Sequence, residues 1–220
     1  MENKQDTRTR RITLLAMLSA LAYVLMVVGR IPVVLFLKYD PKDVIITFAG
    51  LLFGPLSSLA VSVVVSLVEM LTVSDTGVIG LVMNVLSTCC FACTAAWVYR
   101  RRRTLGGAVL GLVAGTLLMT AAMLLWNYLL TPLYMHQPRE TIAAMLAPVF
   151  LPFNLLKGTL NAIFTLLLYK PAVQGLRRAR LVAVPEHSES GRAHMGGMLA
   201  AVAALAAVCV VLLLVLKGLL

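Results

Sequence analysis

Charged residues are scarce in this 220-residue chain: they make up 13% of the sequence, while 60% of the residues are apolar. A water-soluble domain of this size keeps about 30% of its unfolded chain's surface exposed after folding. So little polar sequence could not cover that surface, and the composition excludes an ordinary soluble domain. A lipid environment removes the constraint, so the sequence predicts an integral membrane protein.

Acidic residues are scarcer than basic ones, with 9 Asp and Glu against 19 Lys and Arg and a net charge of +10. The basic residues occur in short runs between apolar blocks. This placement is typical of loops that face an anionic inner leaflet. It does not form a basic recognition face, so we expect a lipid bilayer and no nucleic acid as partner.

Motifs for catalysis and for cofactors are also missing. No Gly-x-x-x-x-Gly-Lys-Ser/Thr loop occurs, so the chain cannot drive transport with ATP through such a loop. His136, His187 and His194 lie in loops or at a span edge, which disfavours an intramembrane enzyme. The cysteines lie inside apolar blocks without a second pair or a histidine, which indicates packing rather than a metal or redox site. They are Cys89, Cys90, Cys93 and Cys209.

Seven apolar blocks resemble membrane-spanning helices, which need roughly 20 residues each. The second block is short and ends at Gly54-Pro55, where a tight turn joins it to the third. The sixth carries Pro148 and Pro152 near its start, where proline is best tolerated. The blocks are Ile12–Gly29, Val44–Phe53, Leu56–Leu71, Val78–Tyr99, Leu105–Leu130, Ala143–Tyr169 and Met195–Leu216. The sequence thus predicts an all-α membrane protein with a six-helix core and a seventh, C-terminal transmembrane helix.

The distribution of basic residues predicts the orientation. With the N-terminus in the cytoplasm, 13 Lys and Arg lie on the cytoplasmic side, 5 lie outside and 1 lies within a span, which accounts for all 19. Cytoplasmic loops carry such an excess. We therefore expect a multi-pass protein of the cell membrane with four parts. These are a cytoplasmic tail (1–11), a six-helix substrate-binding domain (12–175), a polar cytoplasmic linker (176–194) and an additional transmembrane helix (195–220).

Polar side chains within the spans indicate a binding site, because such groups are costly in lipid and usually face a cavity or a partner. Asn154, Lys157 and Asn161 lie three and four positions apart, on one face of the sixth span. Asn84 lies in the fourth span, and Asn127 lies at the end of the fifth. Amides and an ammonium group at this depth suit a neutral ligand with many hydrogen-bonding groups and an apolar body. We expect Asn84, Asn127, Asn154 and Lys157 to line the site.

The first outer loop, residues 30–43, begins apolar and ends charged. An exposed loop would not need the apolar run 33–37, so we expect the segment to fold back over the bundle mouth. It could form a lid there, with Tyr39 and Asp40 facing the cavity. Asp43 is a good N-cap residue, and capping of the next helix is its expected role.

Two small-residue patterns favour close helix packing. Gly107, Gly111 and Gly115 repeat at every fourth position, which lets two helices approach closely. Serines at 58, 62 and 66 form a stripe on the third span that ends in Glu69. We interpret the serines as contacts between helices. Glu69 could pair with Lys157 or lie near the outer surface.

Five short motifs, in this order, resemble riboflavin-specific S components, the substrate-binding subunits of energy-coupling-factor (ECF) vitamin transporters. One such string alone is weak, but five in order are fairly specific, and together they cover Ile12 to Lys170. They are Leu37-Lys-Tyr-Asp-Pro-Lys-Asp43, Leu52-Phe-Gly-Pro55, Thr76-Gly-x-x-Gly-x-x-x-Asn84, Asn127-Tyr128-x-x-x-Pro132-Leu133-Tyr134 and Leu151-Pro-Phe-Asn-Leu-Leu-Lys-Gly158.

This resemblance implies a six-helix core that captures riboflavin from outside the cell, without enzyme activity or a cofactor of its own. The vitamin would sit between the first outer loop and the fourth to sixth spans, with Tyr128 among the binding residues. Two cytoplasmic ATPase subunits would drive uptake through a transmembrane coupling subunit. The family's Ala-x-x-x-Ala contact with that subunit corresponds to Ala16 and Ala20. The seventh helix is not part of the six-helix plan.

Three alternatives are open. The chain could be an S component for another neutral or weakly charged vitamin, an intramembrane enzyme, or a structural membrane scaffold. The enzyme would need paired acids or a histidine cluster within spans. The scaffold leaves Lys157 and the intramembrane asparagines unexplained. Lys157, Lys38 and Arg30 also leave open an anionic ligand such as flavin mononucleotide.

Overall fold

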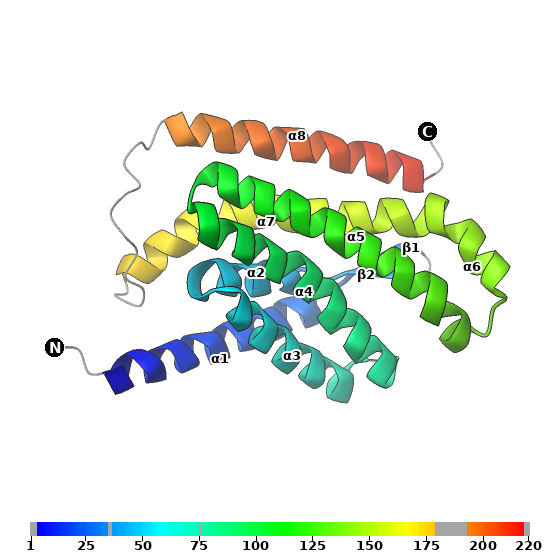
Figure 1. The fold of residues 1–220 in the computed structure, drawn as a ribbon, viewed down its shortest axis with the longest axis horizontal. Helices are drawn as coiled ribbons and strands as arrows, with labels where there is room; N and C mark the ends of the chain where they lie inside the picture. The colour runs from blue at the N-terminus through cyan, green and yellow to red at the C-terminus, as the bar shows by residue number, and fades with distance from the viewer. Residues whose placement is uncertain (1–3, 35–36, 75, 179–192, 218–220) are drawn as a thin grey trace.

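The computed structural model describes residues 4–34, 37–74, 76–178 and 193–217, and most of them are helical (Figure 1). This confirms the predicted all-α membrane architecture. The elements are α1 (Lys4–Gly29), β1 (Ile31–Val34), β2 (Leu37–Tyr39), α2 (Lys42–Phe53), α3 (Pro55–Thr72), α4 (Gly77–Arg102), α5 (Leu105–Met135), α6 (Arg139–Met145), the π-helix η1 (Leu146–Phe150), α7 (Leu151–Arg178) and α8 (Ala193–Leu216).

Six of the described helical segments are long and apolar enough to cross a membrane: α1, α3, α4, α5, the α6–η1–α7 run and α8. The second predicted block forms α2, which has only 12 residues. At the usual rise per residue it is about 18 Å long, well short of a hydrocarbon core of about 30 Å. Its first nine residues, from Lys42 to Gly50, are all buried. The short second helix of the core is therefore enclosed by the other helices.

The predicted turn between the second and third blocks is confirmed. Gly54 has a φ of +96°, a conformation that favours glycine, and Pro55 begins α3. Just before the turn, a Cβ added to Gly50 would lie 2.0 Å from the Ser58 Oγ. The same hydroxyl donates to the Ile46 carbonyl at 3.1 Å. Ser58 thus joins α2 to α3, as expected for a serine that links helices.

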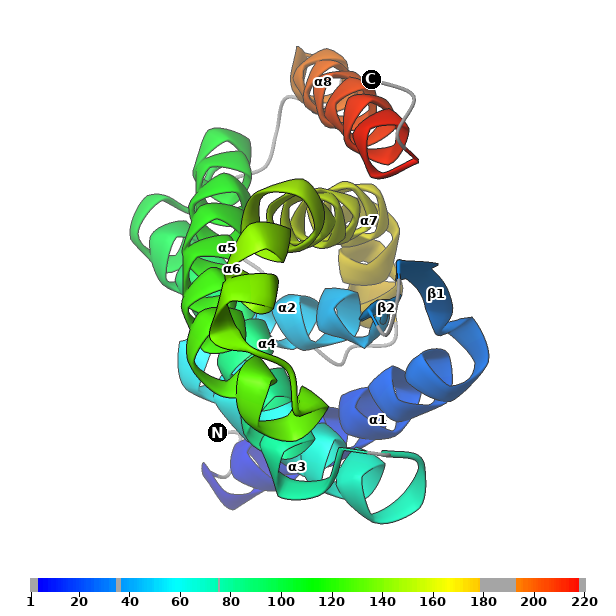
Figure 2. The same cartoon turned by 90° about the vertical axis from the view of Figure 1, so that its right-hand side faces the viewer.

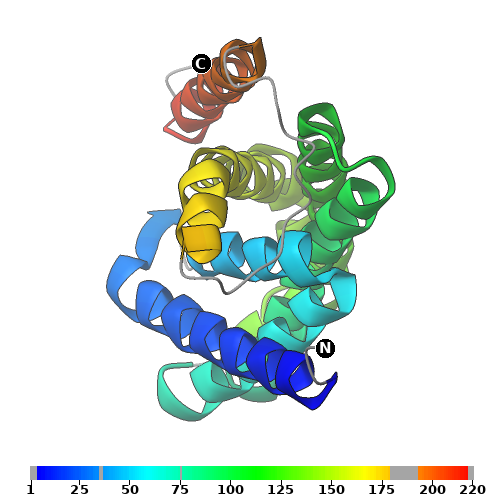
Figure 3. The same ribbon diagram turned by 90° about the vertical axis from the view of Figure 1, so that its left-hand side faces the viewer.

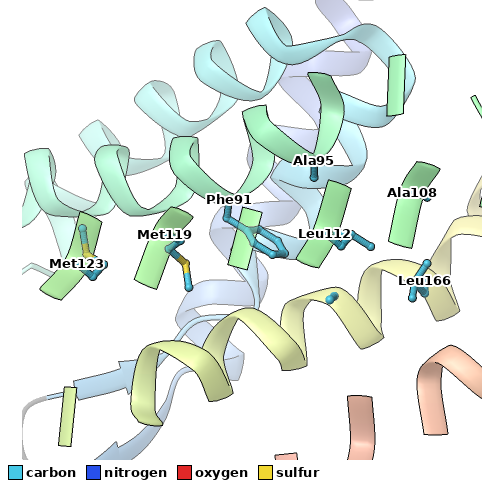
Figure 4. Packing of buried hydrophobic residues seen from close by; sticks show 8 residues of the cluster. Phe91, Ala95, Ala108, Leu112, Met119, Met123 and Leu166 are labelled. Carbon is cyan, nitrogen blue, oxygen red and sulfur yellow. The ribbon is translucent and has the colours of Figure 1, made fainter. Parts of the chain in front are cut away.

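The central packing layer lies between α4, α5 and α7 (Figure 4). Two of the three repeated glycines allow this contact, because a Cβ on Gly111 would lie 2.8 Å from the Ala95 carbonyl oxygen and one on Gly115 would lie 2.5 Å from that of Phe91. The close approach of α4 and α5 confirms the packing role of the repeat. The buried cluster comprises Phe91, Ala95, Ala108, Leu112, Met119, Met123, Ala162 and Leu166.

The first outer loop contains an antiparallel hairpin that the sequence did not predict. Ile31 of β1 is opposite Tyr39 of β2, with an irregular register between Pro32 and Val34. Leu37 is buried in a cluster with three residues of α6, η1 and α7, namely Ile142, Phe150 and Phe153. The segment therefore does fold back onto the bundle, and Figure 2 shows the hairpin beside α7.

The sixth span is longer than predicted and is not uniformly α-helical. It starts with α6 at Arg139, widens into the π-helix η1, which contains Pro148, and continues as α7. Most of the predicted linker, 179–192, lies outside the described residues, and α7 extends to Arg178. The C-terminal helix α8 lies along α7, on the side of the molecule opposite α1 (Figures 2 and 3).

Candidate functional site

Two charged residues, Lys42 and Asp43, begin α2 with none of their surface exposed. A buried ion costs several kcal/mol unless an opposite charge and hydrogen bonds compensate it. The fold supplies these partners from α3, α4 and α7. The result is two adjacent polar networks, one centred on Asp43 and the other on Glu69.

The Asp43 network joins α2 to α4 and α7. Thr88 of α4 donates to Asp43 Oδ1 at 2.7 Å, and Asn161 Nδ2 of α7 lies 3.3 Å from Asp43 Oδ2. The same Oδ2 is 3.1 Å from Lys157 Nζ. Hydrogen bonds to a charged group are stronger than those between neutral groups. One carboxylate therefore sets the position of α2 relative to two long helices.

The Glu69 network joins α2 to α3 and α4. Glu69 is 3% exposed and forms ion pairs with both Arg30 and Lys42. Asn84 of α4 adds a hydrogen bond from its Nδ2 to Glu69 Oε2 at 3.0 Å. Because Lys42 and Asp43 are neighbours in the chain, the first turn of α2 connects the two networks.

The hairpin is attached to both networks. Arg30, directly before β1, donates from Nε to Asp40 Oδ1 at 2.6 Å, directly after β2. Tyr39 donates from its hydroxyl to Asn161 Oδ1 at 2.9 Å. Burial raises the pKa of Tyr39, and the nearby charge of Asp43 raises it further. The hydroxyl therefore keeps its proton at neutral pH and remains a hydrogen-bond donor.

The charges of the two networks balance. Three cations face three carboxylates, and each forms at least one ion pair within the set, which comprises Arg30, Lys42, Lys157, Asp40, Asp43 and Glu69. Amide and hydroxyl groups from Asn84, Thr88, Tyr39 and Asn161 complete the polar surroundings. Such a set can hold a neutral polar molecule without leaving an ion unpaired. Among the described residues, no three His, Cys, Asp or Glu are placed to hold a metal ion.

Four of the seven predicted substrate-binding residues belong to these networks: Tyr39, Asp40, Asn84 and Lys157. Segments from the outer loop, the fourth span and the sixth span therefore do meet, as the polar pattern suggested. Their contact with a ligand stays a prediction.

The structure does not bring the other three residues into the networks. Asn127 and Asn154 are buried, and each donates to the backbone carbonyl four residues earlier in the chain at 2.7 Å. Tyr128 is 40% exposed on α5. A buried amide can be satisfied within its own helix, so depth in a span does not by itself place it at a site. Their role in binding also stays a prediction.

Several network residues were missed or misjudged from the sequence. The N-cap prediction for Asp43 is wrong, because Pro41 occupies the cap position and no side chain caps α2. Glu69 pairs with Lys42 and Arg30, and Lys157 pairs with Asp43 instead. The sequence did contain a signal for these buried ion pairs. Two opposite charges, Lys42 and Asp43, directly precede an apolar block that is too short to span a membrane. The network residues that the sequence analysis did not assign to the site are Arg30, Lys42, Asp43, Glu69, Thr88 and Asn161.

Comparison with known proteins identifies the family of this chain. The family model described as "ECF transporter, substrate-specific component" matches residues 10–169. The riboflavin transporter FmnP of Bacillus subtilis (strain 168) is 30% identical over 190 residues, which cover 79% of this chain and 99% of that protein. The riboflavin transporter RibU of Streptococcus thermophilus (strain ATCC BAA-250 / LMG 18311) is 30% identical over 177 residues, with 75% and 83% covered.

A solved structure, described as the S component of a bacterial ECF transporter, has the same fold. It aligns with a TM-score of 0.65 at 30% identity and covers 77% of this chain and 98% of the other. The residues that the family model matches end at 169, before α8 begins at Ala193. By sequence and by fold, the chain belongs to the family of substrate-specific components of ECF transporters.

Proposed function

We propose that this chain captures riboflavin at the outer side of the cell membrane, as the substrate-binding subunit of an ECF transporter. Two of its relatives are riboflavin transporters by name, and the five ordered motifs point to the same vitamin. The excess of basic residues on one side supports a cytoplasmic N-terminus. In this orientation the hairpin and the start of α2 face outward.

The two charge-balanced networks are the observation that carries this proposal. Riboflavin is a neutral molecule with a flat ring system and a chain of hydroxyl groups. Amides and hydroxyls such as Asn84 and Tyr39 can exchange hydrogen bonds with its polar groups. Leu37 of the hairpin is buried in an apolar cluster with Phe150 and Phe153, so apolar side chains lie close to the polar networks, the combination that a flat ring with polar groups requires. A neutral ligand leaves the ion pairs of the networks intact.

The first test is whether the protein carries flavin. Protein purified from riboflavin-containing cells is expected to show the absorption spectrum of flavin. After removal of the flavin, it should rebind riboflavin with a nanomolar to micromolar Kd. A refolding control is required, because lost binding must be separated from lost structure. A folded protein that binds another vitamin but no flavin would keep the S-component role and exclude riboflavin. Parallel titration with flavin mononucleotide shows whether an anionic ligand is accepted.

Uptake would be driven by two ATPase subunits through a transmembrane coupling subunit, and we place the contact with that subunit on α1. Ala16 and Ala20 lie one turn apart on the exposed face of this helix. Small side chains at this spacing let a helix of another protein approach closely. The hairpin follows the C-terminal end of α1, and Lys42 contacts Met26, six residues after Ala20, so contact at these alanines leaves the binding residues free.

Substituting Ala16→Leu together with Ala20→Leu is expected to prevent assembly with the coupling subunit while riboflavin binding is retained. Copurification with the coupling subunit and the ATPases measures assembly, and flavin titration measures binding. The matched control is Ala200→Leu with Ala204→Leu, which adds the same bulk at the same spacing on the exposed face of α8. If the α1 variant still copurifies with the ATPases, the interface lies elsewhere.

A further inference from the structure

The C-terminal helix α8 packs on the bundle through one defined face. Its inward-facing residues are spaced by four and three positions in alternation, which places them on one side of a helix. On the opposite side, Leu199, Val210 and Val211 are 56%, 57% and 51% exposed. The inward row, all buried or half-buried, comprises Met198, Val202, Leu205, Cys209, Leu212 and Leu216. A regular row of this kind indicates specific docking onto α7 rather than loose association.

The docked face lies directly behind the candidate site. Leu156 and Ile163 of α7 form a buried cluster with Cys209, and Leu212 packs against it. Leu156 immediately precedes Lys157, and Ile163 follows Asn161 by two residues. Tyr39 of the hairpin bonds to Asn161 on this same stretch of α7.

The same cluster supports the hairpin. Val33 of β1 packs against it and also against the cluster that holds Leu37 of β2. A two-stranded hairpin is at best marginally stable on its own, so contacts with neighbouring helices set its position. On the polar side these are the bonds of Tyr39 and Arg30. On the apolar side they include the cluster to which α8 contributes.

We infer that α8 contributes to ligand binding. Its inward face holds α7 and the hairpin together, and this restraint slows the dissociation of riboflavin. The helix lies beyond the residues that the family model matches, so the restraint is an addition to the six-helix plan. The statement about riboflavin rests on the function proposed above, whereas the restraint on the hairpin does not.

The test compares two neighbouring leucines of α8. Leu212→Ala removes a side chain from the inward cluster, and Leu213→Ala removes the same atoms from a residue that is 40% exposed. We expect Leu212→Ala to speed amide hydrogen exchange in β1 and β2 and to raise the riboflavin dissociation rate about three- to tenfold, as for partial loss of a packed side chain. Leu213→Ala should leave both at the wild-type value. Exchange in α4 and α5 reports whether each variant is folded.

Hydrogen exchange is measured without flavin. It therefore shows whether α8 restrains the hairpin even if riboflavin is not the ligand. Equal exchange in the hairpin of the two leucine variants would overturn the inference, as would faster exchange with an unchanged riboflavin dissociation rate. Cys209→Ala, a smaller change on the same inward face, is measured in parallel. If Leu212→Ala does not fold, Cys209→Ala decides by the same two criteria.

Discussion

Asp43→Asn is expected to destabilise the folded protein by about 3–5 kcal/mol, because a buried ion pair loses one partner. The substitution keeps the shape of the side chain and its bond with Thr88. It leaves Lys157, which is 7% exposed, without the carboxylate that lies 3.1 Å away. Thermal unfolding in detergent measures the loss, and riboflavin titration should show binding at least about tenfold weaker, a difference of about 1.4 kcal/mol.

The control variant removes the charge of Lys157 as well, so that no unpaired charge is left in the interior. Asp43→Asn combined with Lys157→Met removes both members of the pair, and replacing a whole buried pair is often close to neutral. The double variant should therefore recover at least half of the stability lost in Asp43→Asn. Lys157→Met is also measured alone. If the stability losses of Asp43→Asn and Lys157→Met add up in the double variant, the two side chains do not interact and the assigned role of the pair is wrong.

Gly115→Ala is expected to destabilise the bundle by about 1–3 kcal/mol, the usual cost of forcing extra atoms into a packed interior. The added Cβ would lie 2.5 Å from the backbone carbonyl oxygen of Phe91, so α4 and α5 would have to move apart. The cluster in Figure 4 lies along this contact. Thermal unfolding in detergent again provides the measurement.

Gly106→Ala is the matched control for this effect, since it makes the same change in the same helix. A Cβ at Gly106 would have no atom within 4 Å outside its own helix, and alanine is favoured over glycine in helices by up to about 1 kcal/mol. Gly106→Ala should therefore be neutral or stabilising. Equal losses in the two variants would show that helix propensity, rather than the approach of α4, explains the effect.

The long helices and their close packing were predictable because they depend on local patterns. Apolar runs of spanning length indicated α1, α3, α4, α5, α7 and α8, and the spacing of Gly111 and Gly115 indicated a close helix contact, which the structure shows to be with α4. The hairpin was not predicted. Its strands have only four and three residues, and contacts with distant helices, rather than a turn motif, determine their position.

The candidate site was predictable only in part, because its bonds connect residues far apart in the chain. Asp43 and Asn161 are separated by 118 positions, and Tyr39 and Asn161 by 122. A polar face on a helix shows that a partner exists without showing which residue it is. Lys157 was therefore placed on a polar helix face without its partner, because Asp43 was interpreted as a helix cap.

The long separation between Asp43 and its partners has a consequence for biogenesis. A charge at the centre of a span costs about 2.5–3.5 kcal/mol on insertion scales and less toward its ends, and α2 begins with the charges of Lys42 and Asp43 on a helix of 12 residues. Alone, α2 has little tendency to enter the bilayer. Lys157 and Asn161 of α7 leave the ribosome more than a hundred residues later, about 6–24 s at ordinary rates of synthesis. The contacts that fix the start of α2 against α7 can therefore form only after nearly three quarters of the chain has been made, so this part of the bundle is completed late in synthesis.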